Sequence, residues 1–264
     1  MIKSEENIIV VYKPMGITPL RAIEELKNLR SKYREQKISY AGRLDPMAEG
    51  LLLLLIGDEN KRRKEYEGLE KVYEAEIILG ISTDTYDALG LIRDIHFEPV
   101  EIRNVGAALK KMIGEQDQFY PPFSSKPVDG HSLYWWARKN RLSEITLPSK
   151  KIVIDEIKII NKKNFVVKDL VQKVIGKISK IQGNFRQDEI KKTWLDLEQK
   201  HPKKSVEMIG VRVRCSSGTY VRGIANTLGE TLGVGAFAYS IKRIQVGKYT
   251  MKDCVEITPK SSLI

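Results

Sequence analysis

Strand-like and helix-like patterns alternate along the whole chain, and this alternation limits the fold more than any other feature. The β-branched run at 8–11 and the apolar run at 51–56 are typical of buried strands, whereas 71–79 alternates apolar and charged residues as a half-buried strand does. Apolar residues recur at helical spacing over 19–29 and 102–113. Because no internal repeat or low-complexity tract separates these segments, we expect a single α/β domain of the α+β type.

One segment, residues 161–204, departs from this pattern. Apolar residues recur at helical spacing over 167–181 and 190–197, and Gly183 and Asn184 favour a turn between them. The segment contains twelve Lys and Arg residues against five Asp and Glu residues, a net charge of +7. These features predict a basic helical hairpin inserted into the sheet domain. Its charge fits either a solvated helical cap or a surface that contacts RNA, and both interpretations stay open.

The chain as a whole is strongly basic. Its 45 Lys and Arg residues exceed its 34 Asp and Glu residues, and the formal net charge is +11. A charge of this sign favours polyanionic partners, because each phosphate that a Lys or Arg neutralises releases condensed counterions. Nucleic acid is therefore a candidate partner.

Signals of a metal site, a disulfide framework or a membrane segment are lacking. The two cysteines, Cys215 and Cys254, and the three histidines have no metal-ligand spacing, and no Gly-rich phosphate loop is present. The most apolar run, Leu51–Ile56, is too short to span a bilayer, and no secretory signal opens the chain. We therefore expect a cytoplasmic protein that binds no metal and no cofactor and relies on its side chains for any chemistry.

Three side chains are candidates for chemistry, each with a simpler alternative. Asp45 lies in a predicted loop between Gly42 and Pro46; a turn-capping role is the simpler interpretation, although a carboxylate in a rigid loop can act as a nucleophile or base. Tyr73 lies among core-facing residues of a predicted strand, where packing is the commoner role. Arg222 begins a predicted helix, where a cation opposes the helix dipole unless a carboxylate pairs with it; a surface arginine is the alternative.

These residues belong to five motifs that, in this order, resemble the TruB family of pseudouridine synthases. The motifs are KPMGIT at 13–18, GRLDPMAEGLL at 42–52, KVY at 71–73 with TDTYDALG at 83–90, PPFSSK at 121–126 with the segment that follows to 138, and CSSGTYVR at 215–222. The resemblance extends from about residue 8 to about residue 249 and is interrupted by the predicted hairpin. Five motifs in one order are a specific signal, whereas each motif alone is not.

The resemblance implies a pseudouridine synthase fold, in which helices flank a mixed, mainly antiparallel sheet that carries the hairpin as an insertion. Asp45 would be the nucleophile that helps detach uracil and reattach it through carbon, without cofactor or metal. Tyr73 would stack on the flipped-out base and take the proton from its C5 atom. Arg222 would pair with Asp45 and aim its carboxylate.

The resemblance also implies a set of substrate contacts. They are Lys13, Tyr40, Arg43, Lys126, Tyr134, Arg138, Arg212, Arg214, Tyr220 and Ile241. Ile241 would form an apolar wall of the pocket, and Lys13 would support the architecture of the pocket. A thumb-like segment at about 119–142 and the strand that carries the two arginines would grip the RNA and its phosphates.

The implied domain organisation is a catalytic domain over 1–250, with the hairpin at about 161–204 inserted in it. The remaining residues, 251–264, would form a short tail, which leaves no room for a C-terminal PUA RNA-binding domain. We expect a monomer. The basic hairpin would compensate for the missing RNA-binding domain.

The implied reaction converts uridine to pseudouridine in the T-loop of tRNA, as tRNA pseudouridine-55 synthases do. Tyr40 stands where the family commonly has a histidine that contacts the T-loop, and Arg43 replaces a residue that is usually small. These departures make the same chemistry on another structured RNA the first alternative. The second is a protein that binds or folds RNA without catalysis, against which the intact set of Asp45, Tyr73 and Arg222 argues.

Overall fold

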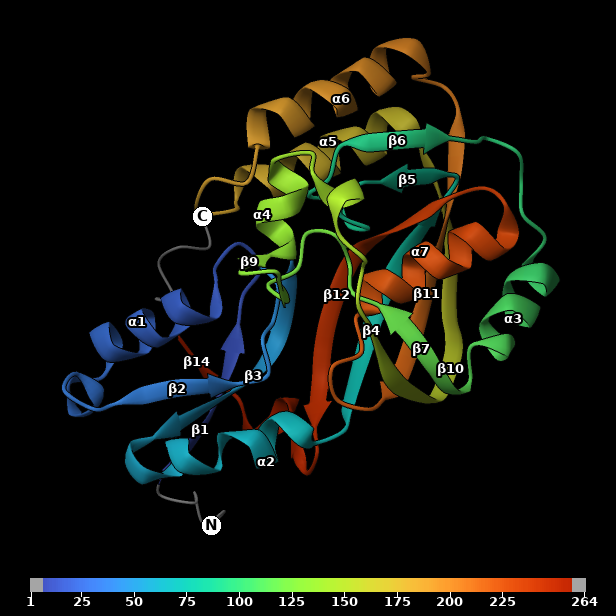
Figure 1. The fold of residues 1–264 in the computed structure, drawn as a ribbon. Helices are drawn as coiled ribbons and strands as arrows, with labels where there is room; N and C mark the ends of the chain where they lie inside the picture. Colours follow the sequence, from blue (N-terminus) through green and yellow to red (C-terminus); the bar gives the residue numbers. More distant parts are fainter. Residues whose placement is uncertain (1–6, 258–264) are drawn as a thin grey trace.

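A mixed sheet of ten strands runs through the centre of the molecule (Figure 1). The computed structural model describes residues 7–257. The strand order is β14-β1-β3-β12-β4-β11-β10-β7, with β2 paired to β3 and β13 paired to β12. Within this described part, only β1 with β14 and β3 with β12 are parallel neighbours. The predicted mixed and mainly antiparallel sheet is therefore confirmed.

The elements have the following bounds. The strands of the central sheet are β1 Ile8–Lys13, β2 Ile38–Ala41, β3 Ala48–Ile56, β4 Lys71–Leu79, β7 Gly114–Phe119, β10 Ser149–Val166, β11 Ser205–Cys215, β12 Ala236–Val246, β13 Tyr249–Thr250 and β14 Val255–Glu256. Two short ribbons pair β5 Ile81–Thr83 with β6 Ile92–Ile95 and β8 Pro127–Val128 with β9 His131–Ser132. The α-helices are α1 Pro19–Leu29, α2 Arg63–Gly68, α3 Ile102–Lys111, α4 Leu133–Arg138, α5 Val167–Ser179, α6 Gln187–Lys200 and α7 Val221–Leu232.

The two faces of the sheet carry separate hydrophobic cores, because side chains alternate between the faces along each strand. On one face, α3 and α7 pack against a cluster that contains Ile77 and Val211. On the other face, α5 and α6 pack against a cluster that contains Ile78 and Met208. Every strand residue in the middle of the sheet therefore has a defined side, and this decides which side chains can reach a common site.

Local sequence accounts for the N-terminal part of the fold. The Oγ1 atom of Thr18 accepts a hydrogen bond from the backbone N–H of Arg21 at 3.2 Å, and Pro19 occupies the first turn, so α1 begins as predicted. One strand of this part was not predicted: Tyr40 and Ala41 lie in β2 and pair with Leu54 and Leu53 of β3. Pairing with the strongly apolar β3 extends this strand up to the loop.

The predicted helical hairpin is present as α5 and α6, and α5 begins at Val167, where the predicted helical spacing begins. Residues 161–166 belong to β10, which continues along β11 as far as Val166. The hairpin does not sit on the sheet as a loose cap, because its inner face is part of the core: the side chains of Val171, Ile190 and Trp194 are fully buried. Its charged residues lie mainly on the outer face.

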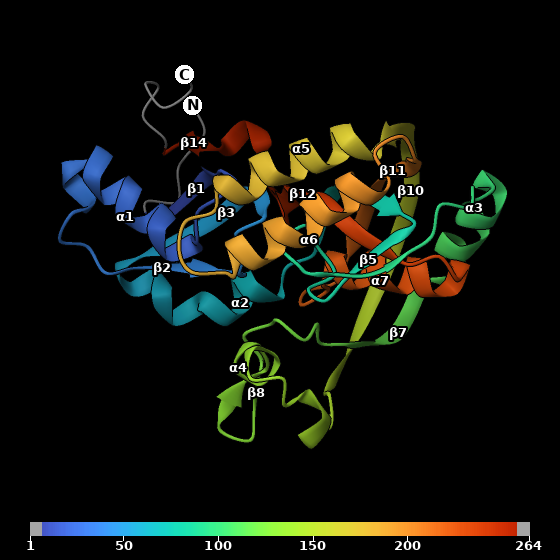
Figure 2. The same ribbon diagram turned by 90° about the horizontal axis from the view of Figure 1, so that it is seen from above.

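The segment between β7 and β10 forms a lobe that projects from the sheet, with α4 and the β8–β9 ribbon at its end (Figure 2). We call residues 119–142 the thumb. The indole N–H of Trp136 donates to the carbonyl oxygen of Val128 at 2.9 Å, and the rings of His131 and Trp135 stack with centroids 3.9 Å apart. These contacts let the thumb keep its shape away from the main core. No helix within residues 7–257 is long and apolar enough to cross a membrane.

Candidate active site

Asp45 lies on the loop between β2 and β3, and a buried arginine holds the backbone of this loop. The guanidinium of Arg243, a residue that is 1% exposed, donates to the carbonyl oxygens of Gly42 at 3.1 Å and Leu51 at 2.8 Å. Gly42 has a φ of +77°, a conformation that side chains disfavour, and it turns the chain out of β2. Since Arg243 fixes the backbone, the side chain of Asp45 remains available for other contacts.

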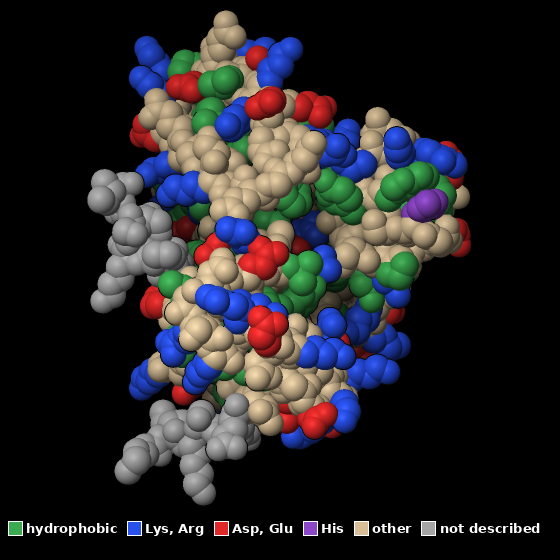
Figure 3. Space-filling model, turned by 90° about the vertical axis from the view of Figure 1, so that its left-hand side faces the viewer, with side chains coloured by type: hydrophobic (Ala, Val, Ile, Leu, Met, Phe, Trp, Pro, Cys, Tyr) green, Lys and Arg blue, Asp and Glu red, His purple; other side chains and the backbone are tan. Residues whose placement is uncertain are grey.

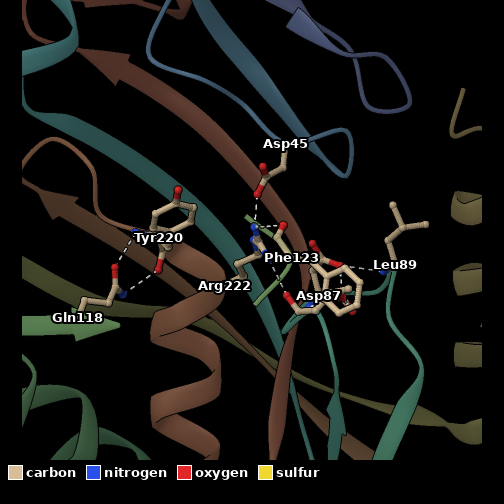
Figure 4. A network of polar contacts seen from close by, with 8 residues as sticks. Asp45, Asp87, Leu89, Gln118, Phe123, Tyr220 and Arg222 are labelled. Carbon is tan, nitrogen blue, oxygen red and sulfur yellow. Dashed lines mark hydrogen bonds and ion pairs between the residues drawn. The ribbon is translucent and has the colours of Figure 1, made fainter. Parts of the chain in front are cut away.

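The carboxylate of Asp45 forms the predicted ion pair with Arg222 (Figure 4). The Nε atom of Arg222 lies 2.9 Å from Oδ2 of Asp45, while its Nη1 and Nη2 atoms donate to the carbonyl oxygens of Thr85 at 2.9 Å and Phe123 at 3.1 Å. Arg222 is 3% exposed, so nearly all of its hydrogen-bonding capacity is used inside the protein. One side chain thus ties together the Asp45 loop, the turn after β5 and the base of the thumb.

A second carboxylate, that of Asp87, faces the same arginine from a buried position. Burial raises the pKa of Asp87 to about 6, although the charge of Arg222 acts in the opposite direction. The Oδ1 atom of Asp87 accepts hydrogen bonds from Oγ1 of Thr85 at 2.7 Å and from the N–H of Leu89 at 2.9 Å. These bonds shape the turn whose Thr85 carbonyl binds Arg222.

A cavity of about 470 Å³ on one side of Asp45 contains Tyr73 and Ile241 in its lining. Both side chains are almost completely buried, and burial raises the pKa of the Tyr73 hydroxyl, with the charge of Arg243 opposing the shift. Lys71 lines the same cavity, and burial lowers its pKa to about 8. The cavity therefore combines an aromatic ring, an apolar wall and several cationic groups with two acidic residues, Asp45 and Glu67.

A second cavity of about 460 Å³ lies on the other side of Asp45 and also reaches Arg222. Its lining is more apolar and includes Leu89 of the turn, Phe123 and Tyr134 of the thumb, and the tip of the hairpin. In Figure 3 a hollow separates the thumb, the lobe on the right, from the body of the molecule, and blue Lys and Arg side chains border it. The two cavities share Asp45, so a ligand could reach this carboxylate from either side.

Tyr220 belongs to both cavities and is held by the last strand before the thumb. Gln118 of β7 accepts a hydrogen bond from the N–H of Tyr220 at 2.8 Å and donates to its carbonyl oxygen at 3.0 Å. The guanidinium of Arg222 lies 5.6 Å from the centre of the Tyr220 ring. Tyr220, one of the expected substrate contacts, therefore lies beside Arg222 where the two cavities meet.

Lys13 lies beneath the site and does not line either cavity. Its side chain is fully buried, and its Nζ atom donates to the carbonyl oxygens of Pro14 at 2.9 Å and Ile17 at 2.8 Å. These bonds hold the turn whose Gly16 N–H donates to the carbonyl oxygen of Pro46 at 2.9 Å. The residue supports the Asp45 loop, as expected from its motif.

The burial of Lys13 predicts a distinctive pH dependence of stability. Burial lowers its pKa from 10.5 to about 7, so between these values the unfolded chain holds a proton that the folded chain does not. The Lys13 contribution to the free energy of unfolding should therefore rise with pH in this window, by up to about 1.4 kcal/mol per pH unit. We expect the free energy of unfolding of the wild type, measured by urea denaturation, to increase from pH 7 to pH 10 relative to that of Lys13→Met. The exposed Lys111, changed to Met, is the control and should show a constant difference; a constant difference for Lys13→Met would contradict the prediction.

Among the other predicted contacts of the thumb and of the β2 region, Tyr40, Lys126 and Arg138 line neither of the two cavities. Arg43 and Tyr134 are among the lining residues, and an Nη2–Oη hydrogen bond of 3.2 Å joins Arg43 to Tyr40. The Nζ atom of Lys126 lies 5.2 Å from the centre of the Tyr120 ring. The guanidinium of Arg138 lies 5.9 Å from the Tyr134 ring and borders an open groove beside the hairpin tip.

Arg212 and Arg214 are not brought to the site. In the pairing of β11 with β4, Val213 is opposite Tyr73, so the two arginines point to the other face of the sheet. There they form ion pairs with Glu74 at 2.6 Å and Glu70 at 2.8 Å. Alternation along the strand thus sends them away from the face that carries Tyr73, and their expected contact with RNA phosphates stays a prediction.

Two arginines that build the site were not among the predicted site residues. Arg243 lies two positions after Ile241, and nothing in its local sequence indicated that it binds the Asp45 loop. Arg186, in the turn of the hairpin, forms a bidentate ion pair with Asp84, with Nη–Oδ distances of 2.8 and 3.2 Å. Both depend on partners far away in the chain, and no local pattern could have revealed them. Residues 7–257 contain no group of three or more His, Cys, Asp or Glu side chains that could hold a metal ion.

Comparison with solved structures identifies the same fold in chains of two assemblies. A chain of a Cbf5-Nop10-Gar1 complex superimposes with a TM-score of 0.59 at 17% identity, over 95% of this chain and 52% of that chain. A chain of an H/ACA RNP bound to a substrate RNA containing 2'-deoxyuridine gives a TM-score of 0.56 at 16% identity, over 95% and 51%. At these identities the likeness concerns the fold alone.

Comparison of sequences gives a closer relationship. Residues 30–175 match the family described as TruB family pseudouridylate synthase (N terminal domain). The chain is 30% identical to tRNA pseudouridine synthase B of Fusobacterium nucleatum over 94% of this chain and 70% of that protein. It is also 30% identical to the protein of the same name from Bacteroides fragilis, over 96% of this chain and 91% of that protein.

The fold, the Asp45–Arg222 pair and these matches together define a pseudouridine synthase, an enzyme of the isomerase class. The chain belongs to the TruB family of pseudouridylate synthases.

Proposed function

We propose that this protein converts a uridine in the T-loop of tRNA to pseudouridine, with Asp45 as the nucleophile. The observation that carries the proposal is the geometry around Asp45: a carboxylate held by a buried arginine at 2.9 Å opens onto a cavity that contains Tyr73. The names of the relatives, tRNA pseudouridine synthase B, support tRNA as the substrate.

The reaction is an isomerisation, so it needs no oxidant, reductant or added group. In the proposed sequence the Asp45 carboxylate helps to break the bond between ribose C1′ and uracil N1, and the detached uracil turns within the cavity. A bond then forms between C1′ and C5, the proton leaves C5, and N1 gains a proton. Atoms and electrons balance, since substrate and product are isomers. A pocket that keeps the detached base close is therefore the main requirement.

The cavity beside Tyr73 meets this requirement. Its volume of about 470 Å³ is in the range of small-ligand sites, and it can enclose one base with part of its ribose. A base must leave the RNA stack to enter it, and contact with an aromatic ring offsets part of that cost. Tyr73 supplies the ring, and Ile241 supplies an apolar wall beside it. Lys71 and Arg243 add positive charge that favours the phosphates on either side of the base.

Tyr73→Phe should lower kcat by about 100-fold or more, because we assign the Tyr73 hydroxyl to removal of the C5 proton. The ring would still stack on the base, so KM should stay within about threefold. Loss of one hydroxyl should change the free energy of unfolding by roughly 1 kcal/mol at most. Tyr33→Phe is the control, since Tyr33 packs against a separate core cluster beyond the two cavities. Tritium release at the wild-type rate from Tyr73→Phe would exclude this role for the hydroxyl.

The reaction is tested by release of tritium from RNA labelled at uridine C5. A tRNA transcript should release tritium in the presence of the protein, and the same transcript with cytidine in place of the T-loop uridines should not. Release that persists after this replacement would move the target to another uridine. If no structured RNA releases tritium, the proposed reaction is wrong. We further infer that the protein acts as a cytoplasmic monomer on this RNA.

One observation favours a different structured RNA as the second candidate. Tyr40 and Arg43, the two departures from the family pattern, are bonded to each other at 3.2 Å, and Arg43 lines both cavities. Since these two residues contact each other next to the site, a different RNA loop as substrate explains both departures together, whereas two unrelated substitutions would need two separate explanations. Mapping of pseudouridine in RNA from cells with and without the protein separates the two candidates. A purely RNA-binding role would leave every site unchanged in that map.

A further inference from the structure

The turn of the helical hairpin is part of the wall of the second cavity. We call residues 183–187 the hairpin tip. Asn184, Phe185 and Arg186 all line the cavity that reaches Asp45. The tip also borders the open groove that Arg138 of the thumb lines. The hairpin therefore does more than cover one face of the sheet, because its turn extends to the cavity that contains Asp45.

The tip is held rigidly by its own hydrogen bonds. The side-chain amide of Gln187 accepts from the N–H of Phe185 at 2.8 Å and donates to the carbonyl oxygen of Gly183 at 2.6 Å. Arg186 adopts a left-handed conformation with φ of 65° and ψ of 30°, which is unfavourable for a side chain of this kind unless other contacts hold it. The tip therefore presents one defined surface to the cavity.

Arg186 connects the tip to the turn that binds Arg222. Its guanidinium pairs with both carboxylate oxygens of Asp84, and the Asp84 side chain is only 4% exposed. The same guanidinium lies 4.2 Å from the centre of the Phe123 ring in the thumb. Asp84 precedes Thr85, and the carbonyl oxygens of Thr85 and Phe123 are the ones that accept from Arg222. The tip and Arg222 are thus anchored to the same two segments.

A second connection joins the hairpin to the Asp45 loop. The N–H of Gln182 donates to the carbonyl oxygen of Gly16 at 2.9 Å, and the N–H of Gly16 donates to Pro46 at 2.9 Å. Gly16 has a φ of +104°, and a Cβ atom at this position would lie 2.5 Å from the carbonyl oxygen of Lys180. Only glycine allows the hairpin backbone to approach so closely. Two backbone hydrogen bonds therefore lead from the hairpin to the residue after Asp45.

The surface that the tip presents suits a base better than a phosphate. Phe185 is half-buried and offers a ring, and Asn184 is exposed and offers an amide. The carboxylates of Asp188 and Glu189 stand directly outside the tip in the open groove and repel phosphates. The only guanidinium of the tip, that of Arg186, is already paired with Asp84.

We propose that the hairpin tip positions the RNA, with Phe185 stacking on the base next to the uridine that enters the Tyr73 cavity. Asp45 lies between the two cavities, so a nucleotide adjacent to the target uridine is the part of the RNA that reaches the second one. The Arg186–Asp84 pair keeps Phe185 in place without touching the RNA. This inference rests on the proposed function and adds a positioning residue to it.

The test is a series of substitutions at Phe185, measured as KM and kcat of tritium release. Phe185→Ala should raise KM about tenfold, the size expected for loss of one stacked base, and leave kcat within about twofold. Phe185→Tyr keeps a ring and should behave as wild type, whereas Phe185→Leu keeps apolar packing without a ring and should behave as Phe185→Ala. Phe97→Ala is the matched control, because Phe97 packs against the same core cluster as Phe185 but lies away from the cavity.

RNA that lacks one base identifies the contact. When the RNA lacks the base that Phe185 contacts, wild type should bind it about tenfold more weakly than intact RNA. Phe185→Ala should weaken the binding of this abasic RNA no further. The 5′ and 3′ neighbours are tested separately. Wild-type KM in Phe185→Leu, or equal effects of Phe185→Ala and Phe97→Ala, would show that Phe185 only packs in the core and would overturn the inference.

A measurement of RNA affinity separates this inference from the proposed reaction. The same Phe185 series in an Asp45→Asn background can be measured as the Kd for tRNA, without turnover. A wild-type protein that releases no tritium would refute the reaction, while a tenfold loss of affinity in Phe185→Ala would still support the tip contact. An active wild type with unchanged KM and Kd in Phe185→Ala would refute the tip contact alone.

Discussion

Asp45→Asn should abolish tritium release, with a loss of at least about 1,000-fold in kcat, while the Kd for tRNA stays within about threefold. The substitution keeps the shape and the hydrogen-bonding reach of the side chain but removes the carboxylate that we assign as the nucleophile. An amide oxygen can still accept from Arg222, so the loop should keep its position. Tritium-release assays measure kcat, and filter binding with the same RNA measures the Kd.

The control for this substitution is Asp155→Asn, since Asp155 is exposed on β10 and lines neither cavity. It should leave both quantities unchanged. If Asp45→Asn kept more than about one tenth of the wild-type kcat, another group would have to be the nucleophile. If it lost RNA affinity and activity together, Asp45 would be a binding residue.

Arg222→Met should remove activity as completely and should also weaken the fold. The change leaves the carbonyl oxygens of Thr85 and Phe123 without their donor in a buried place, and each such group costs about 1–3 kcal/mol. We therefore expect the free energy of unfolding to fall by roughly 3 kcal/mol. The loss of the Asp45 ion pair adds little to this value, because the Asp45 side chain is 30% exposed and can bind water. Urea denaturation and tritium release measure the two effects.

Arg222→Lys distinguishes charge from geometry. A lysine keeps the positive charge but cannot aim three separated donors at Asp45, Thr85 and Phe123 in fixed directions. We expect it to recover part of the stability and little of the activity. Arg103→Met is the matched control, because Arg103 pairs with Glu101 in full contact with solvent and such pairs contribute little. Full activity in Arg222→Lys would mean that Arg222 serves only as a counter-charge.

Secondary structure was largely predictable because its causes are local. The Thr18 cap with Pro19 starts α1, and alternation over Lys71–Leu79 gives β4. The hairpin helices were found from apolar spacing, and α5 begins at Val167 as this spacing predicted, but residues 161–166, which were assigned to the same insertion, belong to β10. The reason is that β10 gains hydrogen bonds along β11 up to Val166, and pairing of this kind is decided by a strand 40 residues away.

The site was predictable in part. Arg222 stands at the start of α7, where a cation is unfavourable, and this local conflict correctly pointed to a carboxylate partner. Arg212 and Arg214 show what a local pattern leaves open. Alternation places both on one face of β11, but only the pairing of Val213 with Tyr73 reveals that this face is opposite the one that carries Tyr73.

The elements, the family motifs and the candidate chemistry of Asp45 follow from the amino-acid sequence, because these depend on spacing and residue type within short windows. The long-range contacts of the site depend on the packing of the folded chain: Arg243 binds the Asp45 loop, Arg186 pairs with Asp84, and the hairpin tip lines the second cavity. These contacts join residues separated by about 100 to 200 positions. Burial makes them strong, since a desolvated arginine must find its partners inside the protein. Where in the chain those partners come from is set by the packing of the whole fold.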